Sequence, residues 1–245
     1  MSRSDATLSS LFGAALVINL PERNDRLRLI QAEFKAARWD NVRVVPGITF
    51  DDPAGFPFKS WRGCFHSHLT CLKIADAENL DSVLILEDDL TLTSALPRVM
   101  PSIIAAAKSL PWDFLYFGHE ESGNIPRASR TTKRITFERP TKEFIQAHFY
   151  AVRKRIIPRL IAHFERLANG QSGDDDFGPM LPDGAYNTFR RHNPDVQTFI
   201  SNPKVGWQGS SRSDITPRSF DGIQSLRPLI SVSRRIKRTL ESVLK

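Results

Sequence analysis

Three consecutive acidic residues close an apolar segment near the middle of the chain. Residues 82–92 read SVLILEDDLTL, so Glu87, Asp88 and Asp89 follow an apolar run. In an open parallel sheet, ligands bind beyond the carboxyl ends of the strands, which is where these carboxylates would lie. Adjacent carboxylates repel unless water or a cation neutralises them, and Mg²⁺ and Mn²⁺ prefer oxygen ligands. The segment predicts either a divalent-cation site on the alternating pair Glu87 and Asp89, or a solvated strand end with Asp89 capping the next element.

A second candidate set consists of Cys64, His68 and Cys71, which share one face of a segment with a helical pattern. Thiols and an imidazole are zinc ligands, but Leu72 and Ala75 extend the same face and structural zinc needs a fourth ligand. We therefore expect His68 to be a buried, hydrogen-bonded histidine that packs this helix, with a polar role in a cleft as the alternative. Seven helical residues would separate the two thiols by about 10 Å, too far for a disulfide. The cysteines thus indicate a reducing compartment.

Apolar runs alternate with amphipathic segments along the chain. Strands are predicted at residues 14–20, 42–45, 83–86, 114–117, 147–152 and 196–200. Helices are predicted at 26–37, with Asn24 or Asp25 as N-cap, and at 62–78, 94–110, a segment ending at 167, and 184–190. Residues 120–142 read as a loop or a β excursion, and the acidic stretch 169–179 as a solvated loop. The alternation predicts an α/β fold with a single mostly parallel central sheet and helices on both faces.

The excess positive charge lies mainly at the C-terminal end. The formal net charge is +7, and residues 226–245 hold six basic residues against one acidic residue. Apolar residues recur at helical spacing in this segment, which predicts a basic amphipathic helix. The helix would lie on an anionic membrane surface or pack on the domain with its charges solvated. We therefore divide the chain into a domain at 1–225 and a helix at 226–245, and deleting the helix should weaken binding to anionic vesicles.

Several classes of protein are disfavoured because their motifs are absent. The sequence has no G-x-G-x-x-G, Walker or G-x-S-x-G pattern, which argues against dinucleotide enzymes, P-loop NTPases and α/β-hydrolases. No apolar run reaches the 18 or so residues of a membrane span, and residues 11–20 lack a basic leader. We expect a cytoplasmic protein that can associate peripherally with the inner membrane through residues 226–245. Nucleic acid is not an expected partner, because that segment lacks aromatic residues for base stacking.

Six short segments occur in a recognisable order. They are VINLPERNDRL at 17–27, RGCFHSHL at 62–69, LILEDDL at 84–90, AHFYAVRK at 147–154, LPDGAY at 181–186 and NPKVGWQGSSRSDI at 202–215. Across roughly residues 14–215 the chain resembles glycosyltransferase family 25, which includes lipopolysaccharide-biosynthesis glycosyltransferases and collagen galactosyltransferases. One departure is His66, which stands where an apolar residue is more usual. The resemblance implies a GT-A type nucleotide-diphospho-sugar transferase fold, with Mn²⁺ or Mg²⁺ held at the acidic motif Glu87-Asp88-Asp89.

The resemblance also implies roles for individual residues. The metal ligands would be Glu87, Asp89 and Asp214, although Asp214 could instead cap a turn. Asp183 would be the general base that takes the proton of the acceptor hydroxyl, or else the N-cap of the helix that follows it. Asp89 is the second catalytic candidate, through the metal. The implied nucleotide-sugar-binding residues are Asn19, Pro21, Arg23, Arg26, Ser67, His68, Glu87, Asp88, Gln208 and Ser213.

Within that set, an arginine offers a planar fork of donors that suits phosphate oxygens. Arg23 and Arg26 could equally be solvated residues at the start of a helix. The function implied is transfer of a hexose, galactose or glucose, from a UDP-sugar to a saccharide acceptor of a lipopolysaccharide or another surface glycan, with inversion. The alternative is a non-catalytic α/β protein that docks on an anionic membrane or nucleic acid through its basic tail.

Overall fold

A computed structural model describes residues 7–121 and 135–209 of the chain. The predicted tail helix at 226–245, together with Ser213 and Asp214, lies outside these ranges. The strands of the main sheet are β1 (Ala14–Asn19), β2 (Val42–Pro46), β3 (Ser82–Glu87), β5 (Phe114–Glu121), β6 (Thr136–Glu138), β7 (Phe144–Arg153) and β8 (Thr198–Asn202). Two further short strands, β4 (Leu90–Leu92) and β9 (Gly206–Gln208), form a separate antiparallel pair.

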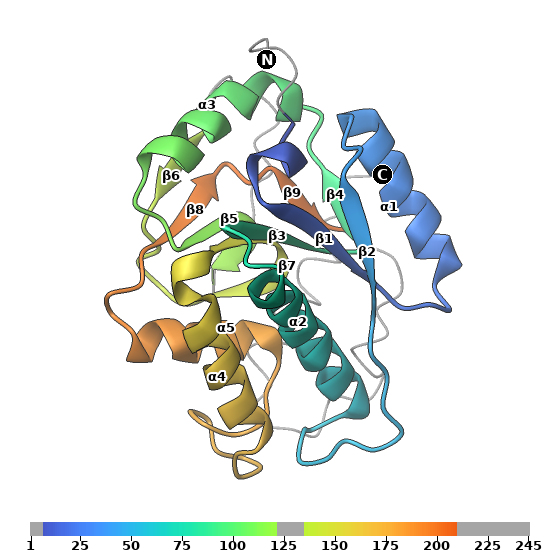
Figure 1. Cartoon of the computed structure of the whole chain (residues 1–245), viewed down its shortest axis with the longest axis vertical. Helices are drawn as coiled ribbons and strands as arrows, with labels where there is room; N and C mark the ends of the chain where they lie inside the picture. Colours follow the sequence, from blue (N-terminus) through green and yellow to red (C-terminus); the bar gives the residue numbers. More distant parts are fainter. Residues whose placement is uncertain (1–6, 122–134, 210–245) are drawn as a thin grey trace, which may run out of the picture.

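The main sheet has the strand order β2-β1-β3-β7-β5-β8-β6 (Figure 1). The pairs β1–β2, β1–β3 and β5–β8 are parallel, whereas β7 runs antiparallel to both of its neighbours and β6 runs antiparallel to β8. Five strands therefore point the same way, and the carboxyl ends of β1 and β3 meet the amino end of β7 at one edge. The predicted fold class, α/β with a mostly parallel sheet, is confirmed.

Helices cover both faces of the sheet. They are α1 (Asn24–Ala37), α2 (Lys59–Ala77), α3 (Leu96–Ser109), α4 (Ile157–Ala168) and α5 (Pro182–His192), with 3₁₀ turns η1 (Ser9–Leu11) and η2 (Lys154–Ile156). Helices α2, α4 and α5 share one core with the residues Ala14 and Leu16 of β1, and α1 and α3 share the other with Ala15 and Val17. Figure 1 shows the two groups of helices on opposite sides of the strands. Successive β1 residues thus bury opposite faces, as the apolar run predicts.

The boundaries differ from the sequence prediction in a few places. The N-cap prediction of Asn24 or Asp25 is wrong: α1 begins at Asn24, and the cap residue is Arg23, which makes no side-chain cap hydrogen bond. The Arg23 guanidinium instead donates to the Asp25 carboxylate at 3.0 Å. Strand β6 supports the β excursion predicted within residues 120–142. Strands β4 and β9 were not predicted, since three residues carry too little pattern to detect.

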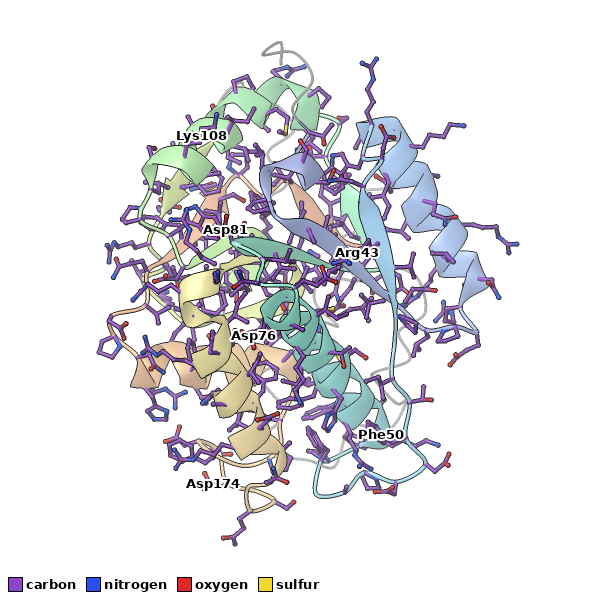
Figure 2. The ribbon with its side chains drawn as sticks, viewed as in Figure 1. Arg43, Phe50, Asp76, Asp81, Lys108 and Asp174 are labelled. Atoms are coloured by element: carbon purple, nitrogen blue, oxygen red, sulfur yellow. The ribbon has the colours of Figure 1, made fainter. Side chains whose placement is uncertain are left out.

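The acidic loop at 169–179 is a turn at the surface, where Figure 2 labels Asp174. The Asp174 carboxylate accepts backbone N–H groups of Asp176 and Phe177 at 2.9 and 3.0 Å, and Asp176 pairs with Arg191 of α5. These contacts agree with a solvated loop. In the two described stretches, no helix combines the length and the apolar character that crossing a membrane requires.

Candidate functional site

The turn after β3 holds its three acids in different environments. Asp88 is nearly fully bonded: the Asn19 amide donates to its Oδ2 at 2.7 Å and Arg26 donates to its Oδ1 at 2.9 Å. Asn19 ends β1 and Arg26 lies in the first turns of α1, so Asp88 joins three elements. Burial raises the pKa of Asp88, and the hydrogen bonds from Asn19 and Arg26 oppose that rise. Because the Arg26 cation neutralises it, Asp88 is a structural anchor of the turn.

Asp89 is the carboxylate left without a full set of partners. Its Oδ1 is buried and accepts no hydrogen bond from the described residues, and its Oδ2 lies 3.7 Å from the Arg26 guanidinium. Burial, followed by the nearby charge of Glu87, raises the pKa of Asp89 to about 8. A buried acceptor without a donor is costly unless a cation or a proton occupies it. The geometry therefore leaves one carboxylate oxygen available to an ion.

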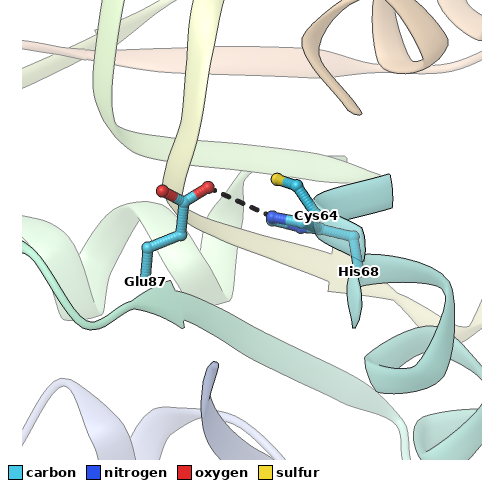
Figure 3. A group of neighbouring side chains, drawn as sticks. All are labelled: Cys64, His68 and Glu87. Carbon is cyan, nitrogen blue, oxygen red and sulfur yellow. Dashed lines mark hydrogen bonds and ion pairs between the residues drawn. The ribbon is translucent and has the colours of Figure 1, made fainter. Parts of the chain in front are cut away.

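Glu87 connects β3 to α2 and β9. Its Oε2 accepts a hydrogen bond from the Gln208 amide at 3.2 Å, and its Oε1 lies 3.2 Å from Nε2 of His68 (Figure 3). Burial alone would raise the pKa of Glu87, but the hydrogen bond and charge of His68, the charge of His148 and the hydrogen bond from Gln208 together lower the pKa. Glu87, Gln208 and His68 were predicted from three separate segments, and the structure brings them into contact.

His68 has polar partners on both ring nitrogens. Its Nδ1 lies 2.8 Å from the Tyr150 hydroxyl, which also contacts the Tyr186 hydroxyl. Tyr150 lies on β7 and Tyr186 on α5, and all three side chains are buried. His68 therefore has the polar role in the site that was the alternative reading, in addition to packing α2 against the sheet.

Asp183 lies at the same edge, but the N-cap prediction for it is wrong. The cap of α5 is Leu181, and both oxygens of Asp183 accept backbone N–H groups of β7, from Gln146 at 2.9 Å and Ala147 at 2.8 Å. Gln146 has a φ of 77°, a conformation uncommon outside glycine. Burial raises the pKa of Asp183, and the charge of Glu87 adds to the rise. Asp183 thus holds an irregular point of β7 beside the acidic turn.

The remaining predicted residues surround this centre. The Ser67 hydroxyl accepts the N–H of Ile48 at 2.9 Å and donates to the Gly63 carbonyl at 2.7 Å, so it ties α2 to the loop after β2. Pro21 is exposed in the turn between β1 and α1, and Arg23 pairs with Asp25. The structure therefore gathers Asn19, Arg26, Glu87, Asp88, Asp89, His68 and Gln208 through direct contacts.

The carboxylate oxygens of Glu87 and Asp89 suit a divalent cation. Asp89 offers a buried, unpartnered oxygen, and Glu87 lies on the same turn with lone pairs beyond its two contacts. Asp88 contributes less to such a site because the Arg26 cation already neutralises its charge. Mg²⁺ is usually held by one or two carboxylates, with water and phosphate oxygens as its other ligands. The third predicted ligand, Asp214, lies outside the described residues.

Sequence reasoning missed three participants. Tyr150 and Tyr186 were read only as parts of apolar or family segments, yet their hydroxyls continue the chain from His68. Cys64 was set aside with the zinc hypothesis, and the structure corrects its partners: Cys71 is buried in the core, while Glu87 takes its place beside Cys64 and His68. No spacing rule links residue 64 to residue 87, because the contact crosses from helix to strand.

Comparison with known proteins gives the family. Residues 59–170 match the sequence model of Glycosyltransferase family 25 (LPS biosynthesis protein). This region belongs to glycosyltransferase family 25. The match contains α2, the acidic turn and β7, and it confirms both the resemblance and the predicted enzyme class over a range narrower than residues 14–215. None of the curated proteins compared with this chain matches it.

Solved structures resemble this chain only distantly. A glycosyltransferase involved in glycosylation of the major capsid of PBCV-1 is 10% identical with a TM-score of 0.48, covering 81% of this chain and 93% of its own. A Drosophila β-1,4-galactosyltransferase 7 mutant in complex with manganese, UDP-Gal and xylobiose is 10% identical with a TM-score of 0.40, covering 87% and 78%. Both TM-scores lie below 0.5, so these likenesses establish no shared function.

Proposed function

We propose that this chain is a metal-dependent hexosyltransferase that takes galactose or glucose from a UDP-sugar. The observation that carries the proposal is the buried, unpartnered Oδ1 of Asp89, beside Glu87, at the carboxyl edge of a sheet in a family 25 region. Mn²⁺ or Mg²⁺ is the cofactor that such oxygens suit. A bound cation there would neutralise the charge that develops on the departing diphosphate.

The chain's own residues give that site its shape. Asn19 and Arg26 hold Asp88, so the turn that carries Glu87 and Asp89 is fixed relative to β1 and α1. Gln208 holds one oxygen of Glu87 and so orients the carboxylate. Fixed ligands reduce the reorganisation needed when the donor binds, which is a general route to rate enhancement. Ser213 and Asp214 follow β9 closely in sequence. We propose that Ser213 contacts the nucleotide-sugar donor and that Asp214 contacts the metal.

The proposed reaction is a single displacement with inversion. The acceptor hydroxyl oxygen attacks the anomeric carbon, the bond from that carbon to the diphosphate oxygen breaks, and the hydroxyl proton moves to Asp183. Two observations support Asp183 as the base: the raised pKa of its buried carboxyl, and the two backbone N–H groups that fix its position. A base with a pKa nearer to neutrality accepts a proton more effectively than an ordinary aspartate.

The acceptor we propose is a saccharide of a lipopolysaccharide or another surface glycan, in keeping with the description of the family. A cytoplasmic enzyme held at the inner membrane by the basic segment 226–245 would meet a lipid-linked acceptor of this kind. Residues 226–245 lie outside the described residues, so their charge pattern in the sequence is what supports the proposed membrane association.

The test is a thermal-shift measurement with UDP-galactose and UDP-glucose, with and without Mn²⁺. A ligand at 100 times its Kd stabilises the folded state by about 2.7 kcal/mol. We expect Mn²⁺ and one UDP-sugar together to raise the Tm of the wild-type protein, and Asp89→Asn to lose that rise.

The matched control is Asp76→Asn, the same substitution at an exposed aspartate near the far end of α2 (Figure 2). It should respond like the wild type. A protein whose Tm is unmoved by any UDP-sugar, or whose shift is the same with and without Mn²⁺ and in Asp89→Asn, is not the enzyme proposed.

A further inference from the structure

Three side chains of different chemistry converge at the helix-facing side of the acidic turn. The Cys64 sulfur, a ring nitrogen of His68 and a carboxylate oxygen of Glu87 all lie within 4.8 Å of one another (Figure 3). Cys64 and His68 are one helical turn apart on α2, and Glu87 ends β3. Sulfur, nitrogen and oxygen together are a typical donor set for Zn²⁺ and for its spectroscopic substitute Co²⁺, whereas Mg²⁺ and Mn²⁺ prefer oxygen alone.

The groups around His68 are those that a metal-binding histidine needs. A histidine that binds a metal through Nε2 must carry its proton on Nδ1 and donate it to a second group. Here Nδ1 lies 2.8 Å from the Tyr150 hydroxyl. Tyr150 can accept that proton's hydrogen bond because its own hydroxyl can donate onward to Tyr186. When an ion replaces the proton between His68 and Glu87, the His68 Nδ1–H can therefore donate to the Tyr150 hydroxyl, and the Tyr150 hydroxyl can donate to that of Tyr186.

The Glu87 carboxylate is also oriented for metal binding. Gln208 donates to Oε2 at 3.2 Å, which leaves Oε1 facing His68. The ligands in a tetrahedral zinc site are about 3.3–3.7 Å apart, given bond lengths of roughly 2.0–2.3 Å. His68 Nε2 and Glu87 Oε1, 3.2 Å apart, already lie at about this spacing. The Cys64 sulfur lies within 4.8 Å of both and would need to approach them by about 1 Å. The side chain of His68 is 1% exposed and that of Glu87 15%, and Cys64 is partly exposed at the residue level.

We propose that Cys64, His68 and Glu87 form a three-ligand site for Zn²⁺, with its fourth position open to water. The site shares only Glu87 with the proposed hard-cation pair Glu87 and Asp89. Binding releases the Cys64 thiol proton to the solvent, because the thiolate is the ligand. His68 and Glu87 already lie 3.2 Å apart on α2 and β3, so an ion between them needs little movement of either element. The zinc site stands without the proposed function.

The experiment titrates Co²⁺ into the metal-free full chain in the absence of any nucleotide sugar. A thiolate bound to Co²⁺ gives a charge-transfer absorption band, and the chain has only two cysteines, so the band can be assigned. We expect the band in the wild type and in Cys71→Ala, whose cysteine is buried in the core. We expect no band in Cys64→Ser, and at least tenfold weaker binding in His68→Asn. Zn²⁺ should abolish the band, and Mn²⁺ should not.

A second measurement uses the wild type alone, in case a variant fails to fold. Zn²⁺ should slow alkylation of Cys64 by a maleimide, followed by peptide mass spectrometry. A band that persists in Cys64→Ser, the absence of a band in the folded wild type, or an alkylation rate unchanged by Zn²⁺ would overturn the proposal. If cobalt does not bind, the thermal shift expected with a UDP-sugar is unaffected. If no UDP-sugar shifts the Tm, the cobalt binding expected here is likewise unaffected.

Discussion

At the scale of single residues, the structure separates carboxylates that look alike in the sequence. Asp88 has donors on both oxygens, Asp89 has an oxygen without any among the described residues, and Glu87 shares its oxygens between Gln208 and His68. The sequence predicted that these acids form a site, but neither their spacing nor their type shows which one a neighbour neutralises. That distinction comes from Asn19 and Arg26, which reach Asp88 from β1 and α1.

Asp183 gives a prediction at this scale. Replacing it with Asn leaves one oxygen to accept an N–H of β7 and turns an NH₂ group toward the other N–H. We expect Asp183→Asn to lower the free energy of unfolding by about 1–3 kcal/mol, as measured by chemical denaturation. Asp176→Asn, which removes an exposed charge paired with Arg191, is the control and should change stability little. An unchanged stability for Asp183→Asn would mean that these two hydrogen bonds do not hold β7.

The Asp183→Asn variant also tests the proposed role of Asp183 as the general base. If Asp183 accepts the proton, the fraction of Asp183→Asn that remains folded should turn over at least 100-fold more slowly than the wild type. A purely structural role would reduce activity only in proportion to the unfolded fraction, which denaturation measures independently.

At the scale of elements, the irregular pairing of β5 and β7 shapes the site. The register shift between Tyr116 and Gly118 places an extra residue in β5, and the shift between Gly118 and Glu120 places extra residues in β7. The second shift lies where Gln146 and Ala147 of β7 meet Asp183. Bulges aim side chains and occur next to active sites. The alternation of apolar residues predicted this strand, but a bulge breaks the very period on which that prediction rests. Its position could not be predicted from the sequence for that reason.

Gly118 is the element-scale test. A Cβ there would lie 2.3 Å from Nε2 of the buried His148 and 3.0 Å from the Gly206 carbonyl oxygen. We expect Gly118→Ala to lower the free energy of unfolding by about 1–3 kcal/mol, because the bulged strand must shift. Gly184→Ala, inside α5, is the control: the nearest atoms to its added methyl all belong to the flexible Met180 side chain, the sulfur first at 2.9 Å. Equal stabilities of the two variants in chemical denaturation would show that the bulge tolerates a side chain.

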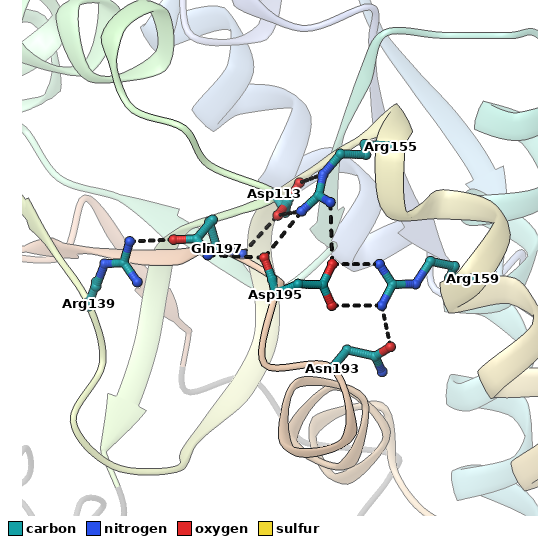
Figure 4. Close-up of polar contacts among 7 residues, drawn as sticks. All are labelled: Asp113, Arg139, Arg155, Arg159, Asn193, Asp195 and Gln197. Atoms are coloured by element: carbon teal, nitrogen blue, oxygen red, sulfur yellow. Dashed lines mark hydrogen bonds and ion pairs between the residues drawn. The ribbon is translucent and has the colours of Figure 1, made fainter.

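The opposite end of the sheet shows a second limit of sequence reasoning. Buried Asp113, at the start of β5, accepts hydrogen bonds from Arg155 and from the backbone of Gln197, and Asp195 links Arg155 to Arg159 (Figure 4). This network ties β5 and β8 to α4. Strand and helix positions were predictable from apolar periodicity, whereas an acid that meets an arginine 42 residues later leaves no local pattern.

At the scale of the whole molecule, buried titratable groups make stability depend on pH in opposing ways. Burial lowers the pKa of His163 to about 4, and the nearby charges of His192 and Arg166 contribute to the lowering. Between pH 6.5 and 4, His163 is protonated in the unfolded chain but not in the folded one. The free energy of unfolding therefore decreases as pH falls from about 6.5 to 4. The raised pKa of Asp89 has the opposite effect, stabilising the fold as pH falls from about 8 toward the ordinary aspartate value.

A substitution isolates one of these contributions. His163→Gln keeps a donor for the Ala185 carbonyl but removes the titration. We expect the stability of His163→Gln relative to wild type to rise as pH falls from 6.5 to 4, by up to about 1.4 kcal/mol per pH unit. Urea denaturation at several pH values measures it. A difference between the two proteins that is constant across this range would contradict the lowered pKa.

The antiparallel strand at the centre of the sheet also has a consequence for synthesis. Strand β3 is apolar and finds one of its two partners, β7, only after α3 and β5 have been made. Ribosomes add roughly 5–20 residues per second, so the growing chain presents the open side of β3 for a time on the order of several seconds. An unpaired apolar strand edge is a template for wrong association. We therefore expect nascent chains that stop before β7 to be the ones that chaperones hold and that aggregate when released.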